Sequence, residues 1–287
     1  MKSIVKKLLV ISVFSLFSVL NSILFSQNTG GAIKLEYNYP ADKEVILINN
    51  TKVKQTMDIM GQSMEVYVNS ALGSTIRSAG KVDGNLKLEV RIDTIGQYVD
   101  SPQGGAGGAV KDVKGKTFNM IITPQGKEID ASEAEKIVYY IEGSGETNAY
   151  QSFIDFFPDL PVNEIKPGDT WNSTDSVSVA TPAMSTKMVV SYENKFEGIE
   201  VFNGVECALI SSTLSGKRSM ATQSQGMDIF TSGPFTGTST LLFGLREGYF
   251  LKHTVITKMT GNIDISGPEN MTFPLIMDMT NVNEVKK

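Results

Sequence analysis

Two of the side-chain types that most often act in catalysis are scarce in this 287-residue sequence. Histidine occurs once, as His253, and cysteine once, as Cys207. A nucleophile system of the Ser-His-Asp or Cys-His type would have to use His253. Residues 251–256 form an apolar, strand-like segment, in which a core or edge histidine with satisfied hydrogen bonds is more typical than a general base. Cys207 lies in a similar segment, and we expect it to be a small buried side chain on a strand.

The carboxylates closest to forming a catalytic group are Asp155, Asp159 and Asp169, which lie beside an aromatic segment and Trp171. Two carboxylates that flank a sugar can hydrolyse a glycosidic bond. Prolines surround Asp159 and Asp169, however, and acids in such segments typically cap turns. A hydrolase that uses Asp155, Asp159 or Asp169 is therefore a minor alternative, and we expect no catalytic residues.

Metal and cofactor motifs are also missing from the sequence. A cysteine-based zinc site needs more thiols than one, and no His-Glu-x-x-His helix occurs. Asp93 and Asp100 lack the regular spacing of a calcium loop. The glycine-rich run at residues 101–110 is not followed by Gly-Lys-Ser/Thr, so we expect a mobile loop there and no phosphate site. We expect no metal and no cofactor.

The first 26 residues have the order of features found in a secretory signal peptide. Lys2, Lys6 and Lys7 precede an apolar run at residues 8–25, and the small residue Ser26 follows. An uncleaved membrane anchor is the alternative, since 18 apolar residues nearly span a bilayer. We expect export to a periplasmic, outer-membrane-associated or extracellular location, with at most peripheral membrane contact.

The net charge argues against one class of partner. Removal of residues 1–26 takes away three lysines and no acid, so the formal charge changes from −5 to −8. Nucleic-acid binding needs a basic surface that neutralises phosphates. We therefore expect no nucleic-acid partner.

Most of the remaining chain has the apolar–polar alternation of β-strands. The clearest example is residues 86–92, with apolar side chains at even positions and charged ones between them. Turn signals separate such runs at residues 61–63 and 124–126 and at Asn203-Gly204, which is a strong hairpin signal. The pattern predicts a mainly β fold (α+β), either a curved antiparallel sheet or a half-barrel.

Residues 131–157 change period. The sequence Ser132-Glu133-Ala134-Glu135 predicts a capping box, and apolar residues recur at helical spacing up to Ile141, before Gly143. A second short helix is predicted over residues 148–157, ended by Pro158. We expect residues 27–287 to form a single β-rich domain whose two short central helices pack on the concave face of the sheet.

The sequence contains 13 methionines, many of them in predicted strands. Flexible thioethers line adaptable apolar grooves, and they also fill large cores. Both interpretations remain open. The groove interpretation predicts binding of a lipid or other hydrophobic small molecule by five side chains near the helices: Tyr150, Phe153, Ile154, Phe157 and Trp171.

Several strings of the sequence resemble a family of secreted β-rich proteins of unknown function from Bacteroidetes. They are residues 55–62, Leu160-Pro161, and residues 165–171, 202–210 and 246–251. The resemblance implies a cell-envelope location and a β-rich fold, and it carries no catalytic residues. The order of strands and helices is also distantly similar to periplasmic lipoprotein carriers, which are half-barrels with helices in the concavity.

These observations predict a non-enzymatic envelope protein that binds a lipid or another hydrophobic ligand between sheet and helices. The alternative of a different class is a structural or assembly factor of the cell envelope. Such a protein would contact other envelope proteins through exposed strand edges.

Overall fold

The computed structural model describes residues 31–286, except 60, 143–144, 181–183, 225–226 and 268–269. The chain divides into two compact units, Met1–Gly31 and Ala32–Lys287, and every strand and helix described belongs to the second. The predicted signal peptide at residues 1–26 lies outside the described residues, as does Gly143. Among the described residues, neither helix is long and apolar enough to cross a bilayer.

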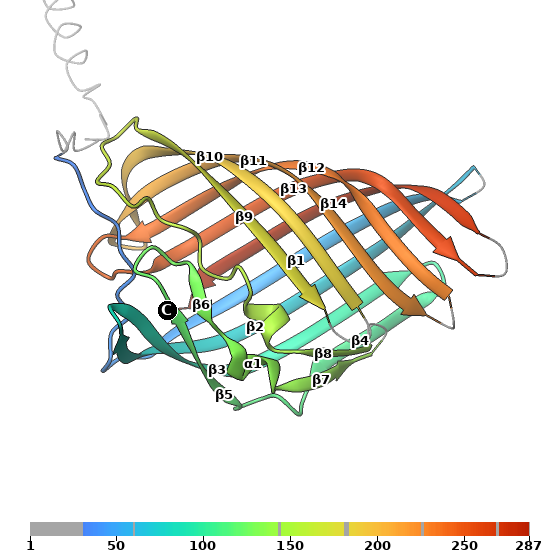
Figure 1. The fold of residues 1–287 in the computed structure, drawn as a ribbon, viewed down its shortest axis with the longest axis horizontal. Helices are drawn as coiled ribbons and strands as arrows, with labels where there is room; N and C mark the ends of the chain where they lie inside the picture. The colour runs from blue at the N-terminus through green and yellow to red at the C-terminus, as the bar shows by residue number, and fades with distance from the viewer. Residues whose placement is uncertain are drawn as a thin grey trace, which may run out of the picture. The chain divides into compact units, whose positions relative to one another are not determined.

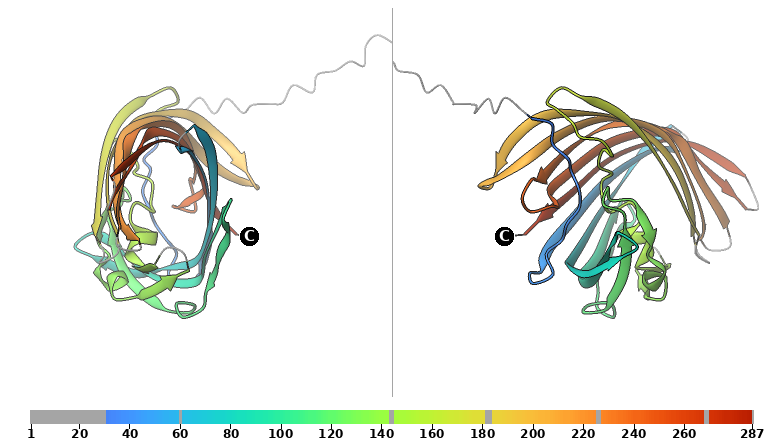
Figure 2. Two further views of the ribbon diagram at one scale, coloured as in Figure 1. Left: turned by 90° about the vertical axis from the view of Figure 1, so that its right-hand side faces the viewer. Right: turned by 60° about the vertical axis from the view of Figure 1, so that its left-hand side comes forward.

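Twelve of the described strands form one antiparallel sheet in the order β6-β5-β3-β2-β1-β14-β13-β12-β11-β10-β9, with β4 paired to β3 (Figure 1). Its strands are β1 Val45–Ile59, β2 Gln62–Val82, β3 Asn85–Ser101, β4 Gly104–Val110, β5 Thr117–Ile122, β6 Glu128–Asp130, β9 Thr170–Ala180, β10 Met184–Phe202, β11 Val205–Ser224, β12 Met227–Gly244, β13 Phe250–Ser266 and β14 Met271–Val285. In the part of the chain described, β6 and β9 do not pair, so the sheet is open. The predicted mainly β, curved antiparallel fold is confirmed, and Figure 2 shows the curvature.

Local sequence explains the strands and their turns. In β3, Leu86, Leu88 and Val90 are at most 1% exposed, while the residues between them are partly accessible, as the alternation predicts. The hairpin between β10 and β11 turns at Asn203 and Gly204, whose φ values are 53° and 82°. Positive φ at both central residues matches the right-handed twist of the flanking strands.

The predicted helices are present but much shorter than expected. They are α1 Ser132–Glu135 and α2 Tyr150–Phe153, separated by a hairpin of β7 Val138–Ile141 and β8 Gly145–Asn148. The extension of the first helix to Ile141 was wrong, because the run Val-Tyr-Tyr-Ile combines β-branched and aromatic residues that favour a strand. The second helix ends at Phe153 because Ile154 is extended and Asp155 has a φ of 57°.

The predicted capping box is also wrong. The residue that caps α1 is Ala131, and no side chain forms a cap hydrogen bond. Ser132 instead donates its backbone N–H to Asp130 Oδ1 at 2.9 Å, and Glu133 accepts the backbone N–H of Asn119 at 2.8 Å. Both carboxylates therefore satisfy nearby backbone donors outside the helix.

The glycine-rich run is a strand and not a loop. Residues Gly104–Val110 form β4, which pairs with the second half of β3 from Ile95 to Ser101. Ladder hydrogen bonds need only the backbone, so the lack of side chains does not prevent pairing. Gly107 has a φ of 116°, and a Cβ there would clash with the carbonyl oxygen of Gln97.

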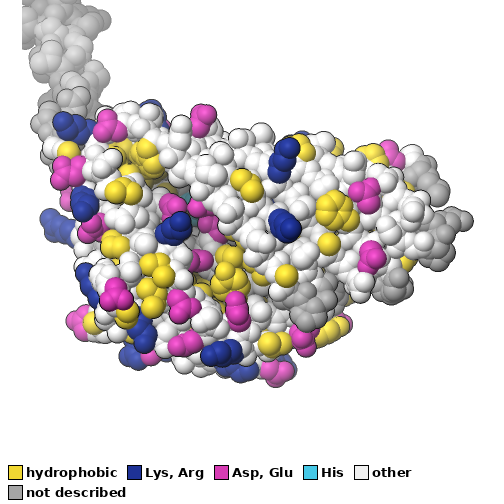
Figure 3. Space-filling view, in the orientation of Figure 1, with side chains coloured by type: hydrophobic (Ala, Val, Ile, Leu, Met, Phe, Trp, Pro, Cys, Tyr) yellow, Lys and Arg dark blue, Asp and Glu magenta, His cyan; other side chains and the backbone are white. Residues whose placement is uncertain are grey.

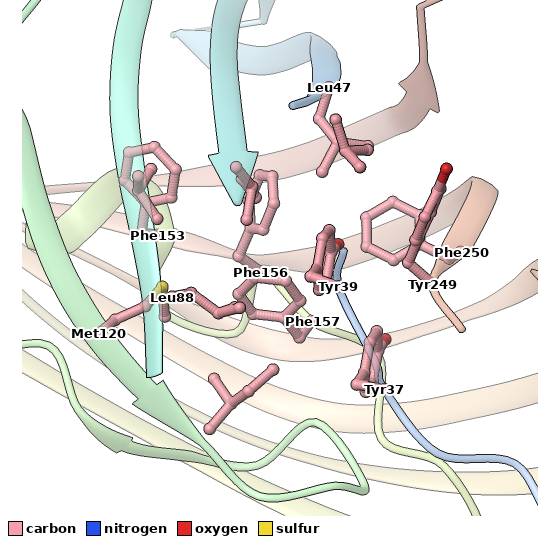
Figure 4. Packing of buried hydrophobic residues seen from close by; sticks show 14 of the residues in the cluster. Tyr37, Tyr39, Leu47, Leu88, Met120, Phe153, Phe156, Phe157, Tyr249 and Phe250 are labelled. Carbon is pink, nitrogen blue, oxygen red and sulfur yellow. The ribbon is translucent and has the colours of Figure 1, made fainter. Parts of the chain in front are cut away.

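Buried aromatic side chains close one end of the concave face. Phe153 and Phe157, from α2 and the segment after it, pack among Tyr37, Tyr39 and Phe156, with ring centroids 5.2–6.4 Å apart for the contacting pairs (Figure 4). Tyr37 donates its hydroxyl hydrogen to the carbonyl oxygen of Pro158 at 2.9 Å. This aromatic cluster holds the segment that carries α1 and α2 against the inner side of the sheet.

Candidate functional site

A cavity of about 460 Å³ lies on the concave face of the sheet. Its walls are inward side chains of β1–β3 and β9–β14, and residues 139–159 cover part of it. Figure 3 shows acidic side chains around a hollow on this side of the molecule. The volume lies within the usual range for small-molecule pockets.

Strand register sorts the cavity wall into two bands. Side chains at alternate positions point inward, so residues paired across the ladder share the same level. One level carries uncharged polar groups, and we call it the polar band: Thr51, Ser70, Asn194, Ser212, Ser239 and Asn281. The next three levels on one side of it carry the apolar band: Met188, Val190, Leu214, Phe235, Met259, Met277 and Met279. The wall therefore has one polar zone and one apolar zone.

Hydrogen bonds between neighbouring strands satisfy much of the polar band. Ser212 donates to Asn194 Oδ1 at 2.7 Å, and the Asn281 side-chain amide donates to Thr51 Oγ1 at 2.7 Å. Asn283 lies next to the band on β14, is 5% exposed, and its Oδ1 atom has no hydrogen-bond partner. The Nε2 atom of Gln151, which lines the cavity from α2, is buried without a partner as well. Unsatisfied buried polar atoms are costly, and these two lie on the wall where a ligand would meet them.

His253 lies on the cavity wall beside Asn283, its partner on the neighbouring strand β14. Burial lowers the pKa of His253 to about 4, so the imidazole is uncharged at neutral pH. No hydrogen bond or ion pair joins its side chain to another residue in the described part of the chain. The hydrogen bonds that the sequence predicted for this histidine are not formed with described side chains and stay a prediction.

Four carboxyl groups gather at the edge of the cavity where the segment after α2 meets β6 and β9. Burial raises the pKa of Glu128 to about 7 and that of Asp159 to about 6, and Asp175 nearby raises the pKa of Asp159 further. Asp155 lines the cavity and keeps exposed surface; desolvation, followed by the charges of Asp175, Glu128 and Asp159, raises its pKa to about 8. Glu128, Asp155 and Asp159 therefore titrate near neutral pH and can hold or release protons there.

This arrangement brings together two of the three predicted carboxylates. Asp155 and Asp159 both line the cavity, with Asp175 from β9 beside them. Asp169 caps a turn by accepting the Lys166 backbone N–H at 2.8 Å, as the flanking prolines led us to expect, so it does not join the minor hydrolase alternative. Across the described residues, no three His, Cys, Asp or Glu side chains are arranged to hold a metal ion.

The five side chains predicted to bind a ligand are in different places. Ile154 lines the cavity. Phe153 and Phe157 are at most 2% exposed in the aromatic core, and Tyr150 and Trp171 pack partly buried against that core. A direct contact with a ligand thus stays a prediction for Ile154, whereas the four aromatic residues lie in the hydrophobic core or pack against it.

Several wall residues escaped the sequence analysis. Each lies on a strand at the parity of an inward apolar residue of the same strand: Asp175 with Val177, Arg218 with Leu214, and Asn283 with Met277. Parity alone would have indicated that they point inward. Cys207 is buried as predicted, and burial raises the pKa of its thiol to about 11.

Comparisons with known proteins leave the family open. No family model matches the sequence, and no curated protein matches it. Among solved structures, Pseudomonas aeruginosa OccK2 (OpdF) is 10% identical, with 82% of this chain and 68% of that chain covered and a TM-score of 0.19. Acinetobacter baumannii OccAB4 is 9% identical, with 85% and 97% covered and a TM-score of 0.13. TM-scores this low do not establish a common fold.

Proposed function

We propose that this is an exported, non-enzymatic protein of the bacterial cell envelope that binds a lipid or another hydrophobic ligand in the cavity. The observation that carries the proposal is the apolar band, in which four methionines and three other apolar side chains face an internal space. Methionine adapts to irregular apolar ligands because its side chain is flexible and polarisable. The signal-like residues 1–26 support the location.

A cavity wall with both a polar band and an apolar band fits an amphiphile better than a pure hydrocarbon. Beyond the apolar band, the polar band and the unpartnered Asn283 Oδ1 offer hydrogen bonds to a polar group. Pockets of this kind bury most of a ligand in apolar surface and orient it with a few polar contacts.

The first experiment is extraction of the full-length protein, purified from its native host, with organic solvent and mass spectrometry of the extract. We expect a stoichiometric amphiphilic molecule. A clean extract, together with no uptake of a fluorescent acyl probe by the purified protein, would contradict the proposal.

Two variants on one strand test whether binding takes place in the cavity. Val255 lines the cavity, and its neighbour Ile256 is 51% exposed on the other face of β13. Val255→Trp should fill the space and abolish probe uptake, whereas Ile256→Trp should leave it unchanged. Equal uptake by both variants would locate the ligand elsewhere.

A hydrolase remains the second candidate because Asp155, Asp159 and Asp175 converge on one wall. Burial and mutual repulsion separate the pKa values of such groups, which is how one carboxyl becomes an acid and another a base. Assay of the purified protein against nitrophenyl glycosides and esters tests it. Turnover that disappears in Asp159→Asn would favour an enzyme, and no turnover in the wild type would exclude these substrates.

A further inference from the structure

Arg218 is a cation on the cavity wall. It lies on β11 at the inward parity of Ser212 and Leu214, level with Met188 at the end of the apolar band that is farther from the polar band. Across the ladder it pairs with Met188 on β10 and with Gly233 on β12. Since Gly233 has no side chain, the guanidinium has an apolar neighbour on one side and bare backbone on the other.

No acid of the described chain neutralises Arg218. It forms no ion pair and no side-chain hydrogen bond with a described residue, and burial alone lowers its pKa, without an opposing carboxylate. The four clustered carboxyl groups of Glu128, Asp155, Asp159 and Asp175 therefore do not contribute to the shift in the pKa of Arg218. Every other arginine that pairs in the described part does so on exposed surface, as Arg77 does with Glu89 and Arg91 with Glu44.

An unpaired, poorly hydrated guanidinium is energetically costly, and a planar oxyanion is the partner that matches its fork of N–H donors. We propose that Arg218 binds the anionic group of the ligand, so that the ligand is an amphiphile with a carboxylate or phosphate on an apolar chain. This inference rests on the proposed function and names the ligand class for the same cavity. With the anion at Arg218, the chain lies along the apolar band towards the polar band, whose level on β11 is six residues, or about 20 Å, away.

Binding of matched probes tests the inference. The full-length protein is titrated at pH 7.5 with a fluorescent long-chain fatty acid (cis-parinaric acid), its methyl ester, a long-chain alkyl phosphate and inorganic phosphate. The variants are Arg218→Met, Arg218→Lys and, as the matched control, Lys217→Met, which removes an exposed cation on the opposite face of β11.

We expect the wild type to bind the acid and the alkyl phosphate more tightly than the ester, and inorganic phosphate not measurably. Arg218→Met should weaken binding of the two anionic probes by about 10- to 100-fold and that of the ester by less than about twofold. Arg218→Lys should fall between, and Lys217→Met should match the wild type. A cooperative thermal unfolding transition for each variant checks that the variant is folded.

The outcomes separate the two proposals. If the wild type binds neither acid nor ester, the cavity-binding function fails. If it binds both equally, or if Arg218→Met weakens binding of the acid and of the ester to the same extent, the cavity binds apolar chains but Arg218 does not bind an anionic group. Binding of inorganic phosphate as tightly as the alkyl phosphate would make the site an anion site without a lipid.

Discussion

The Glu128 side chain on β6 accepts the backbone N–H of Asp155, with 3.2 Å between Oε2 and the nitrogen. The other carboxylate oxygen accepts the N–H of Phe156, also at 3.2 Å. Asp155 has a φ of 57°, so two donors in a strained turn depend on one side chain. Glu128 therefore fastens the segment after α2 to the sheet at the edge of the cavity.

Removal of this side chain should loosen the segment. Glu128→Ala leaves two backbone N–H groups without their acceptor and should lower the free energy of unfolding by about 1–3 kcal/mol. Glu128→Gln keeps one acceptor oxygen and should cost less. Urea unfolding of the three proteins checks this. Identical midpoints for Glu128→Ala and the wild type would contradict the anchoring role.

The raised carboxyl pKa values predict how stability depends on pH. An aspartate or glutamate begins to ionise near pH 4 in the unfolded chain, whereas the pKa of Glu128 is about 7 and that of Asp155 about 8 in the fold. Between these limits the folded state holds more protons than the unfolded state, so the free energy of unfolding falls as pH rises from about 4 to 8. This contribution is fully present below pH 4 and lost above pH 8.

Asp155→Asn should remove part of that slope. Unfolding temperatures measured from pH 4.5 to pH 8.5 should decline less steeply in Asp155→Asn than in the wild type, because the amide does not titrate. Glu200→Gln, at an exposed position on β10, is the control and should keep the wild-type slope. Parallel profiles for Asp155→Asn and the wild type would show that Asp155 is hydrated normally in the cavity.

The strands were predictable because their signals are local. Alternation in residues 86–92 and the Asn203-Gly204 turn need no knowledge of the partner strand. The end of the first helix was not predictable in this way. The apolar positions Ile137, Val138 and Ile141 fit a helical stripe, and pairing of β7 with β8 decided in favour of a strand.

The cavity depends on register, which one sequence does not display. Asp159 and Asp175 are 16 residues apart, and they meet because β9 is the edge strand that faces the segment after α2. The prediction of aromatic ligand contacts came from apolar concentration in residues 150–157. Such concentration indicates burial, and the most apolar side chains, such as Phe153, went into the core.

Alanine substitutions at two adjacent glycines of β4 test whether the lack of a side chain allows this strand to pair with β3. A Cβ at Gly107 would clash with Gln97 and would have to adopt a φ of 116°, whereas a Cβ at Gly108 meets nothing within 4 Å. Gly107→Ala should therefore disrupt the pairing of β4 with β3, and Gly108→Ala should not. Hydrogen exchange of the amides of residues 95–110 measures the difference. Equal protection in both variants would show that the β4 backbone tolerates a side chain at either position.

The last prediction concerns the cost of keeping Arg218 unpaired. Arg218→Met replaces a poorly hydrated charge by an apolar side chain of similar length beside Met188. In ligand-free protein this change should stabilise the fold by about 1 kcal/mol, or roughly 2–4 °C in unfolding temperature. Saturating fatty acid should stabilise the wild type more than the variant, because only the wild type gains an ion pair on binding. Calorimetry of both proteins with and without the acid measures the four temperatures. If ligand-free Arg218→Met unfolds below the wild type, the guanidinium already has a favourable environment and the argument for an anionic ligand loses its energetic basis.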